Sequence, residues 1–160
     1  MPTPPIHGFF SASIAGEITK QLKRIAERQD GAGEFAAQIM SWASARILLK
    51  EDEGLGASDV PLLRRPDEQF QHERAMYPGV VLEISCSPNR KDLRKRAWDY
   101  IQYSNGDIKA VIGFAFNYGE GESTVSLWRP AFVREEGEEL DILDVKRIAH
   151  QVGHVQRCAG

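Results

Sequence analysis

The spacing of apolar residues changes along this chain, and each spacing predicts a different secondary structure. Between Ser11 and Arg28 the apolar side chains recur every three or four positions, at Ile14, Ile18, Leu22 and Ile25. This spacing predicts an amphipathic helix that ends before Asp30-Gly31. A second, shorter helix is predicted from Glu34 to about Trp42.

Strands are predicted where the pattern becomes a short apolar run or an alternation of apolar and polar residues. These segments are residues 45–50, 67–72, 80–85, 109–118 and 123–129. A helix between the third and fourth of them is expected to begin at Ser87-Pro88, with Ser87 as N-cap, and to end at Asn105-Gly106. Residues 58–65 are expected to form an irregular connection, residues 135–139 a loop and residues 140–152 a final helix.

This order of elements predicts an α/β or α+β domain with a central mixed sheet. A chain of 160 residues is most simply one domain. The Pro-rich start, residues 1–10, is expected to be a flexible lead-in to a domain over residues 11–133. Residues 134–160 are expected to form an acidic loop and a C-terminal helix or tail.

Composition and charge narrow the class of protein. Apolar residues make up 42% and charged residues 27% of the chain, as in ordinary globular proteins. No membrane span and no secretory signal are expected. The chain has only two cysteines, Cys86 and Cys158, and a disulfide between them is not expected. We therefore predict an intracellular setting, in the cytoplasm or the nucleus. The net charge is −3. Residues 88–103, however, carry five basic residues against two acids, whereas residues 134–147 carry six acids against three bases.

Asp67 and Glu83 are the main candidates for chemistry. Asp67 begins one predicted strand and Glu83 lies within the next apolar strand, so the two carboxylates can meet on one face of the sheet. Mg²⁺ prefers one or two carboxylates together with waters and substrate phosphate. The alternative is that Glu83 faces solvent on a half-exposed strand. A metal site predicts that both carboxylates lie within reach of one ion.

The same region resembles the PD-(D/E)xK restriction-endonuclease-like superfamily, and in particular an uncharacterised fungal group of it. The segments that carry the resemblance are Pro66-Asp67-Glu68-Gln69-Phe70, Tyr77 to Ser85, Lys91-Asp92-Leu93, Ala97, Tyr100-Ile101 and Ser126 to Pro130. The resemblance covers roughly residues 11–130. The resemblance implies an αβββαβ core with a central mixed sheet flanked by helices.

The resemblance also implies roles for individual residues. Asp67 and Glu83 would hold Mg²⁺ or Mn²⁺, and the backbone carbonyl of Ile84 would add a further oxygen. The family's lysine position is Ser85 here, which departs from the pattern. In some members the lysine lies on the following helix, so Lys91 is expected to replace it, with Lys95 as an alternative. An ordinary solvated basic face is the other interpretation of both lysines.

The resulting hypothesis is a metal-dependent phosphodiesterase that acts on nucleic acid, with DNA favoured over RNA. Arg90, Arg94 and Lys95 would contact flanking phosphates. One alternative is a catalytically inactive domain of the same fold that binds nucleic acid or protein. Another is an interaction domain in which the two acids are incidental. A homodimer is left open, because many nucleases of this fold act as dimers.

Other polar residues are weighed as lesser candidates. Gln69 could contact a metal-bound water, although a neutral neighbour is favoured, and His72 is expected to be structural. Glu17 and Glu34 on the leading helices could each add a carboxylate to the site. The remaining histidines, His7, His150 and His154, lie near the chain ends and are not expected to form a catalytic triad.

Overall fold

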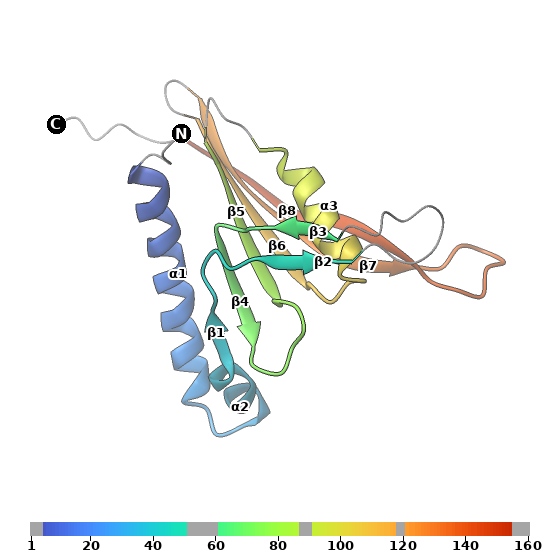
Figure 1. The fold of residues 1–160 in the computed structure, drawn as a ribbon, viewed down its shortest axis with the longest axis horizontal. Helices are drawn as coiled ribbons and strands as arrows, with labels where there is room; N and C mark the ends of the chain where they lie inside the picture. The colour runs from blue at the N-terminus through green and yellow to red at the C-terminus, as the bar shows by residue number, and fades with distance from the viewer. Residues whose placement is uncertain (1–4, 51–60, 87–90, 118–120, 155–160) are drawn as a thin grey trace.

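The computed structural model describes residues 5–50, 61–86, 91–117 and 121–154 (Figure 1). The elements follow one another in the order α1 (Pro5–Ala26), α2 (Gly31–Ala37), β1 (Ile39–Ser41), β2 (Ile47–Leu49), β3 (Leu62–Arg64), β4 (Glu68–His72), β5 (Val80–Cys86), α3 (Leu93–Tyr103), β6 (Ala110–Phe116), β7 (Glu122–Val133) and β8 (Ile142–His154).

Six of these strands form one mixed sheet in the order β1-β4-β5-β6-β7-β8. Strands β5 and β6 are parallel, and every other neighbouring pair is antiparallel. Helix α3 joins the two parallel strands, because a parallel pair needs a crossover connection. Strands β2 and β3 form a separate antiparallel pair. The predicted mixed α/β architecture with a central mixed sheet is confirmed.

Alternate residues of β5 enter two separate cores. Leu82 and Ile84 pack with the apolar face of α1, whereas Val81 packs with Tyr100 and other residues of α3. Helices α1 and α3 therefore cover opposite faces of the sheet (Figure 1). Because side chains alternate along a strand, Glu83 lies on the face that α3 covers.

The N-terminal third differs from the prediction in three places. Helix α1 begins at Pro5, inside the expected lead-in, and proline is tolerated in a first helical turn. The second helix ends at Ala37, and β1 follows it where the helix was expected to continue. Residues 62–64, expected to be irregular, form β3. β1 and β3 are strands because each pairs with a strand that is distant in the sequence: β1 with β4, and β3 with β2.

Helix α3 starts later than predicted. Residues 87–90 lie outside the described residues, and the helix begins at Leu93 with Asp92 as its N-cap. The Asp92 side chain accepts a hydrogen bond from the Lys95 backbone N–H at 2.9 Å. The predicted start at Ser87 is therefore wrong, whereas the predicted stop is confirmed by positive φ angles of 52° at Asn105 and 75° at Gly106.

The predicted C-terminal helix over residues 140–152 is wrong. This segment forms β8, which pairs with β7 from Glu122↔His154 to Val133↔Ile142. Leu143 and Val145 of β8 pack against the core on the α3 face. Apolar residues in this segment fit both a helical and an alternating pattern, and the long neighbouring strand β7 decides between them.

Candidate functional site

The site forms where β4 begins beside β5. Asp67 directly precedes β4, and its backbone N–H donates to the Leu82 carbonyl at 3.1 Å. Two residues further along β5, the Ile84 N–H donates to Asp67 Oδ2 at 2.6 Å. The Asp67 carboxylate therefore bonds the edge of β5 just outside the first residue of β4, which fixes it next to Glu83.

Lys91 joins the two acids. Its Nζ lies 2.8 Å from Asp67 Oδ2 and 2.9 Å from Glu83 Oε2. Its backbone N–H donates to Ser85 Oγ at 2.8 Å, so Ser85, two residues after Glu83, holds the backbone of the lysine that reaches the acids. Asp67, Glu83 and Lys91 are thus brought together, with Lys91 placed just before α3 rather than within it.

The second oxygen of Glu83 is bonded by α3. Oε1 accepts hydrogen bonds from the Arg96 guanidinium at 3.0 Å and from the Tyr100 hydroxyl at 2.6 Å. Arg96 and Tyr100 are four residues apart and share one face of the helix. The Glu83 side chain is only 1% exposed, and a carboxylate buried this deeply needs such partners. The sequence-based prediction gave Tyr100 no role at the acids and did not select Arg96; the four-residue spacing places the two donors on one helix face but does not show that this face meets Glu83.

Both helix-borne donors keep their protons. Burial and the negative charge of Glu83 raise the pKa of Tyr100 far above its ordinary value, although Arg96 and Arg64 act in the opposite direction. Burial lowers the pKa of Arg96, but the negative charge of Glu83 and its hydrogen bond to the guanidinium act in the opposite direction, and the net result is a raised pKa of Arg96. Tyr100 therefore stays a neutral donor and Arg96 stays a cation.

His7 contacts the other oxygen of Asp67. Its Nε2 lies 3.3 Å from Asp67 Oδ1, and Ser11 Oγ donates to the Asp67 backbone carbonyl at 3.3 Å. Both residues come from α1 and are four positions apart. The prediction set His7 aside as a residue of the chain end, because the start of α1 was placed too late.

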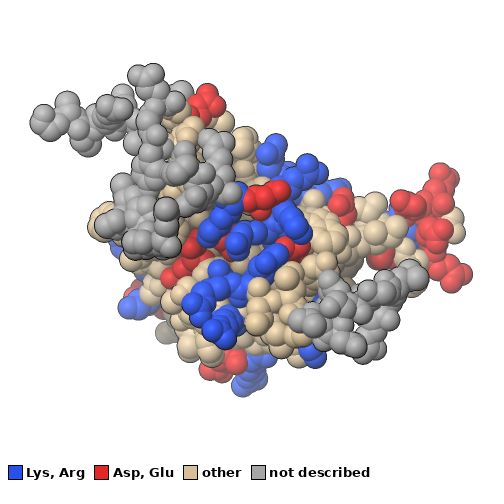
Figure 2. Space-filling model, turned by 45° about the horizontal axis from the view of Figure 1, so that its top comes forward, with Lys and Arg blue, Asp and Glu red and all other residues tan. Residues whose placement is uncertain are grey.

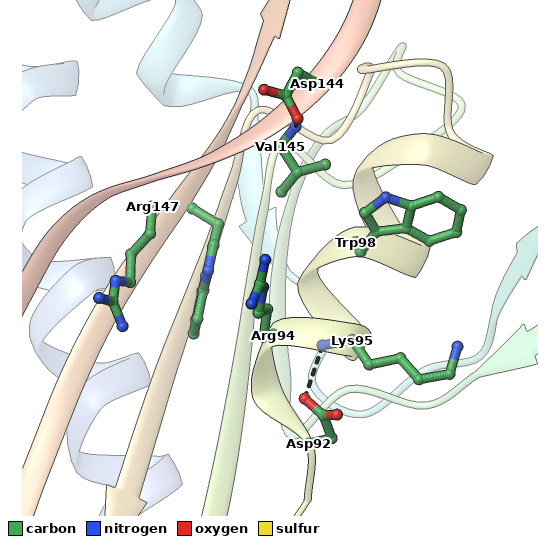
Figure 3. A pocket seen from close by; sticks show the side chains of 8 residues that line it. Asp92, Arg94, Lys95, Trp98, Asp144, Val145 and Arg147 are labelled. Atoms are coloured by element: carbon green, nitrogen blue, oxygen red, sulfur yellow. Dashed lines mark hydrogen bonds between the residues drawn. The ribbon is translucent and has the colours of Figure 1, made fainter.

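Two of the predicted substrate-binding residues, Arg94 and Lys95, make no hydrogen bond or ion pair with Asp67 or Glu83. The Lys95 ammonium lies 3.2 Å from Asp99 Oδ1, so Lys95, the alternative to Lys91, does not contact Asp67 or Glu83. Asp99 is also bonded by Arg64. Arg94 lines a groove between α3 and β8 (Figure 3). Arg90 lies outside the described residues.

Four of the lesser candidates make no contact with the two acids: Gln69, His72, Glu17 and Glu34. Gln69 Nε2 donates to the backbone carbonyl of Ala45 at 2.8 Å. The His72 ring stacks on a phenylalanine ring of α2 at 4.9 Å, in keeping with a structural role. Glu17 bonds Gln21 on the exposed surface of α1, and the exposed Glu34 lies on α2. The suggestion that either glutamate adds a carboxylate is not supported by these contacts.

The donor set fits a hard divalent cation. Asp67 Oδ2 and Glu83 Oε2 contact the same ammonium, so a cation is already accommodated between them. The Ile84 carbonyl faces the same edge of β5 as its N–H, which contacts Asp67. No group of three or more His, Cys, Asp and Glu side chains in the described parts of the chain could hold a metal ion. Two carboxylates and one carbonyl match Mg²⁺, which takes its remaining ligands from water and phosphate.

Comparison with known proteins gave no assignment. No family model matches the chain, and neither the curated proteins nor the solved structures contain a significant match. Among the helices of the described residues, none has the length and apolar character needed to cross a membrane.

Proposed function

We propose that this chain is a divergent member of the restriction-endonuclease-like superfamily and a metal-dependent phosphodiesterase that acts on nucleic acid. The observation that carries the proposal is the position of the Lys91 ammonium, 2.8 Å from Asp67 and 2.9 Å from Glu83. The resemblance implies a cation at this place, and Ser85 cannot supply it. A lysine that reaches both acids from the segment before α3 fills the role.

The order of elements supports the same proposal. With α2 and the β2–β3 pair regarded as insertions, the chain runs α1, β1, β4, β5, α3, β6, which is an αβββαβ order. The strand with Glu83 is central and parallel to the strand that follows α3. Strands β7 and β8 then extend the sheet beyond this core.

The proposed mechanism divides the work among the residues of the site. Mg²⁺ or Mn²⁺ held by Asp67, Glu83 and the Ile84 carbonyl would polarise the scissile phosphate and activate a water. The Lys91 ammonium offsets negative charge that develops on the phosphate. Arg96 and Tyr100 fix the orientation of Glu83, and such supporting bonds sustain metal affinity.

The test is cleavage of plasmid DNA and of RNA with Mg²⁺ and with Mn²⁺. Wild type is expected to cut at least one substrate, whereas Asp67→Asn and Lys91→Met are expected to lose cleavage while they remain folded. Lys20→Met is the matched control, because the Lys20 side chain is 69% exposed on α1 and, among the described residues, pairs with Glu17 alone. Wild type that is as inert as Asp67→Asn on every substrate would remove the enzymatic proposal.

The second candidate is a non-catalytic binding module of the same fold. One observation favours it: the two carboxylates of the site already have two cations, Lys91 and Arg96, so their charges balance without a metal. Calorimetric titration with Mn²⁺ separates the candidates. Binding heat that is measured for wild type and is absent for Glu83→Ala supports the metal site. No binding heat for wild type or Glu83→Ala, together with retained nucleic-acid binding, supports the binding module.

A further inference from the structure

A large groove lies between α3 and the β7–β8 hairpin, on the same face of the sheet as the acids. Its volume is about 820 Å³. The residues that define it are Arg94, Lys95 and Trp98 of α3, Asp144 and Arg147 of β8, and Trp128 of β7. Trp128 is buried, so its ring forms part of the floor. In Figure 3, Arg94 lies between Arg147 on one side and Trp98 on the other.

Two guanidinium groups in this groove have no partner in the described part of the chain. Neither Arg94 nor Arg147 forms an ion pair or a side-chain hydrogen bond there. The groove's acids are already engaged: Asp92 Oδ1 accepts from the Lys95 backbone N–H, and Asp144 Oδ1 accepts from the Val145 N–H. Unpaired guanidinium groups on the walls of a groove suit phosphate oxygens, which they bind in a bidentate manner.

Trp98 adds a flat apolar surface to these charges. The residue is 44% exposed. The ring packs edge-on against Tyr103, at 5.6 Å between centroids and 87° between planes, so the indole is supported from one side. An exposed indole beside guanidinium groups is the combination that binds a nucleic-acid strand by stacking its bases and pairing its phosphates.

The surface around the groove favours a polyanion locally. Figure 2 shows Lys and Arg gathered on this side of the molecule, with a few acids among them, whereas acidic residues cluster on a projection at the far right. The net charge of the chain is −3, so attraction of a nucleic acid depends on this local distribution rather than on overall charge.

The groove also adjoins a second cavity that reaches Lys91, the lysine that bonds the two acids. A smaller cavity of about 270 Å³ is lined by Ser85 and Lys91, and it shares Asp92 with the groove. The two hollows therefore adjoin at the residue that caps α3. A strand that passes Lys91 can continue past Asp92 to Arg94 and Trp98.

We propose that the groove between α3 and β8 binds an unpaired segment of a nucleic-acid strand, with phosphates on Arg94 and Arg147 and a base stacked on Trp98. The segment is unpaired because a base within a duplex cannot place its face against the indole. This inference deepens the proposed function and rests on it for the choice of nucleic acid as the ligand. It assigns the substrate class: a single strand, or a duplex with a single-stranded end.

The experiment measures binding without cleavage. Fluorescence anisotropy follows a labelled oligothymidine of about twelve nucleotides in EDTA, with a duplex of the same length in parallel. Trp98→Ala is expected to weaken single-strand binding about tenfold, and Trp98→Phe is expected to restore most of it. Arg94→Gln and Arg147→Gln are each expected to reduce the slope of log K against log salt by about 0.7. Trp42→Ala is the matched control, because the Trp42 side chain is 49% exposed and lies outside the groove.

Three results would overturn the inference. The first is Trp98→Ala and Arg147→Gln binding like wild type. The second is duplex binding at least as tight as single-strand binding, and the third is inorganic polyphosphate competing as well, per charge, as the oligonucleotide. If these occur while Mg²⁺-dependent cleavage persists, only the groove assignment fails. If groove-dependent binding is found but no substrate is cut, only the phosphodiesterase fails.

Discussion

Glu83 and Asp99 are two buried carboxylates with the same kind of surroundings. Each side chain is 1% exposed. Each forms ion pairs with one lysine and one arginine: Lys91 and Arg96 for Glu83, and Lys95 and Arg64 for Asp99. By burial and by the types of residue in their ion pairs, the two groups are indistinguishable.

The two carboxylates differ in whether their lysine also bonds a second acid. Lys91 bonds a second carboxylate, Asp67, so two acids converge on one cation. The Asp99 cluster has one acid and two cations among the described residues, which leaves no carboxylate pair for a divalent ion. Burial beside cations is thus common to a structural ion pair and a metal-capable site. Convergence of two acids on one cation distinguishes the second.

The largest effect is expected on the stability of the protein when the carboxylate of Asp99 is removed. Asp99→Ala leaves the Arg64 guanidinium, whose side chain is 25% exposed, without its carboxylate. Breaking a buried pair from one side is costly, so we expect a loss of about 3 kcal/mol in the free energy of unfolding. Urea denaturation followed by circular dichroism measures it.

A paired substitution provides the control for Asp99. Arg64→Met/Asp99→Leu replaces both charges with apolar groups, which often restores stability. The double variant is expected to recover most of the loss and to keep the wild-type cleavage rate, because neither residue contacts Asp67. A folded double variant that no longer cleaves would show that the Asp99 cluster belongs to the site and that the comparison fails.

The next effect concerns a partner that only Glu83 has. Tyr100→Phe removes the hydroxyl that donates to Glu83 Oε1 at 2.6 Å. A hydrogen bond to a charged acceptor contributes about 2 kcal/mol, and we expect this loss in the free energy of unfolding at neutral pH. Tyr103→Phe is the control, because the Tyr103 hydroxyl makes no hydrogen bond among the described residues.

Tyr100→Phe is also expected to change how the stability of the protein depends on pH. Tyr100 has a raised pKa in the folded protein, whereas an unfolded tyrosine titrates near 10.0. Above about pH 10 the unfolded chain therefore binds fewer protons than the folded one, and stability falls as pH rises. The difference between wild type and Tyr100→Phe should be largest below pH 10 and shrink above it. A constant difference up to alkaline unfolding would contradict the buried, neutral Tyr100.

Local sequence signals account for the parts of the fold that local structure determines. Helix α1, strand β5 and the stop after α3 at Asn105-Gly106 follow from periodicity and turn residues. Strands β1 and β8 do not, since their strand character comes from pairing with β4 and β7. The helical prediction for residues 140–152 failed because the apolar spacing there is ambiguous without the neighbouring strand.

Some residues of the candidate site can likewise be predicted from local sequence, and others cannot. Asp67, Glu83 and Lys91 could be selected from order and spacing, because adjacent strands and the following connection bring them together. His7 and Arg96 could not be assigned from spacing alone. The contact between His7 and Asp67 depends on where α1 begins and on how α1 packs against the sheet. The contact between Arg96 and Glu83 depends on the rotation of α3 about its axis, which is also set by packing.

A smaller effect tests whether the shared cation and a metal compete. Lys91→Met removes the ammonium between Asp67 and Glu83, while Arg96 and Tyr100 still bond Glu83. Since the Lys91 side chain is 27% exposed, we expect a loss of only about 1 kcal/mol in the free energy of unfolding. Affinity for Mn²⁺, measured by calorimetry, should rise, because the ion no longer displaces an ammonium from the same oxygens. Unchanged or weaker Mn²⁺ binding would argue against a metal at these two carboxylates.

The smallest effect is expected at the other lysine. The Lys95 side chain is 66% exposed and reaches Asp99 along the surface of α3, four residues away. Exposed pairs of this spacing contribute about 0.4 kcal/mol, so Lys95→Met should change the free energy of unfolding by no more than that. Because no second acid shares this lysine, its removal should also leave Mn²⁺ affinity unchanged. If Lys95→Met instead raised Mn²⁺ affinity as much as Lys91→Met, the gain would reflect a general loss of positive charge on α3, and the distinction between Glu83 and Asp99 would no longer hold.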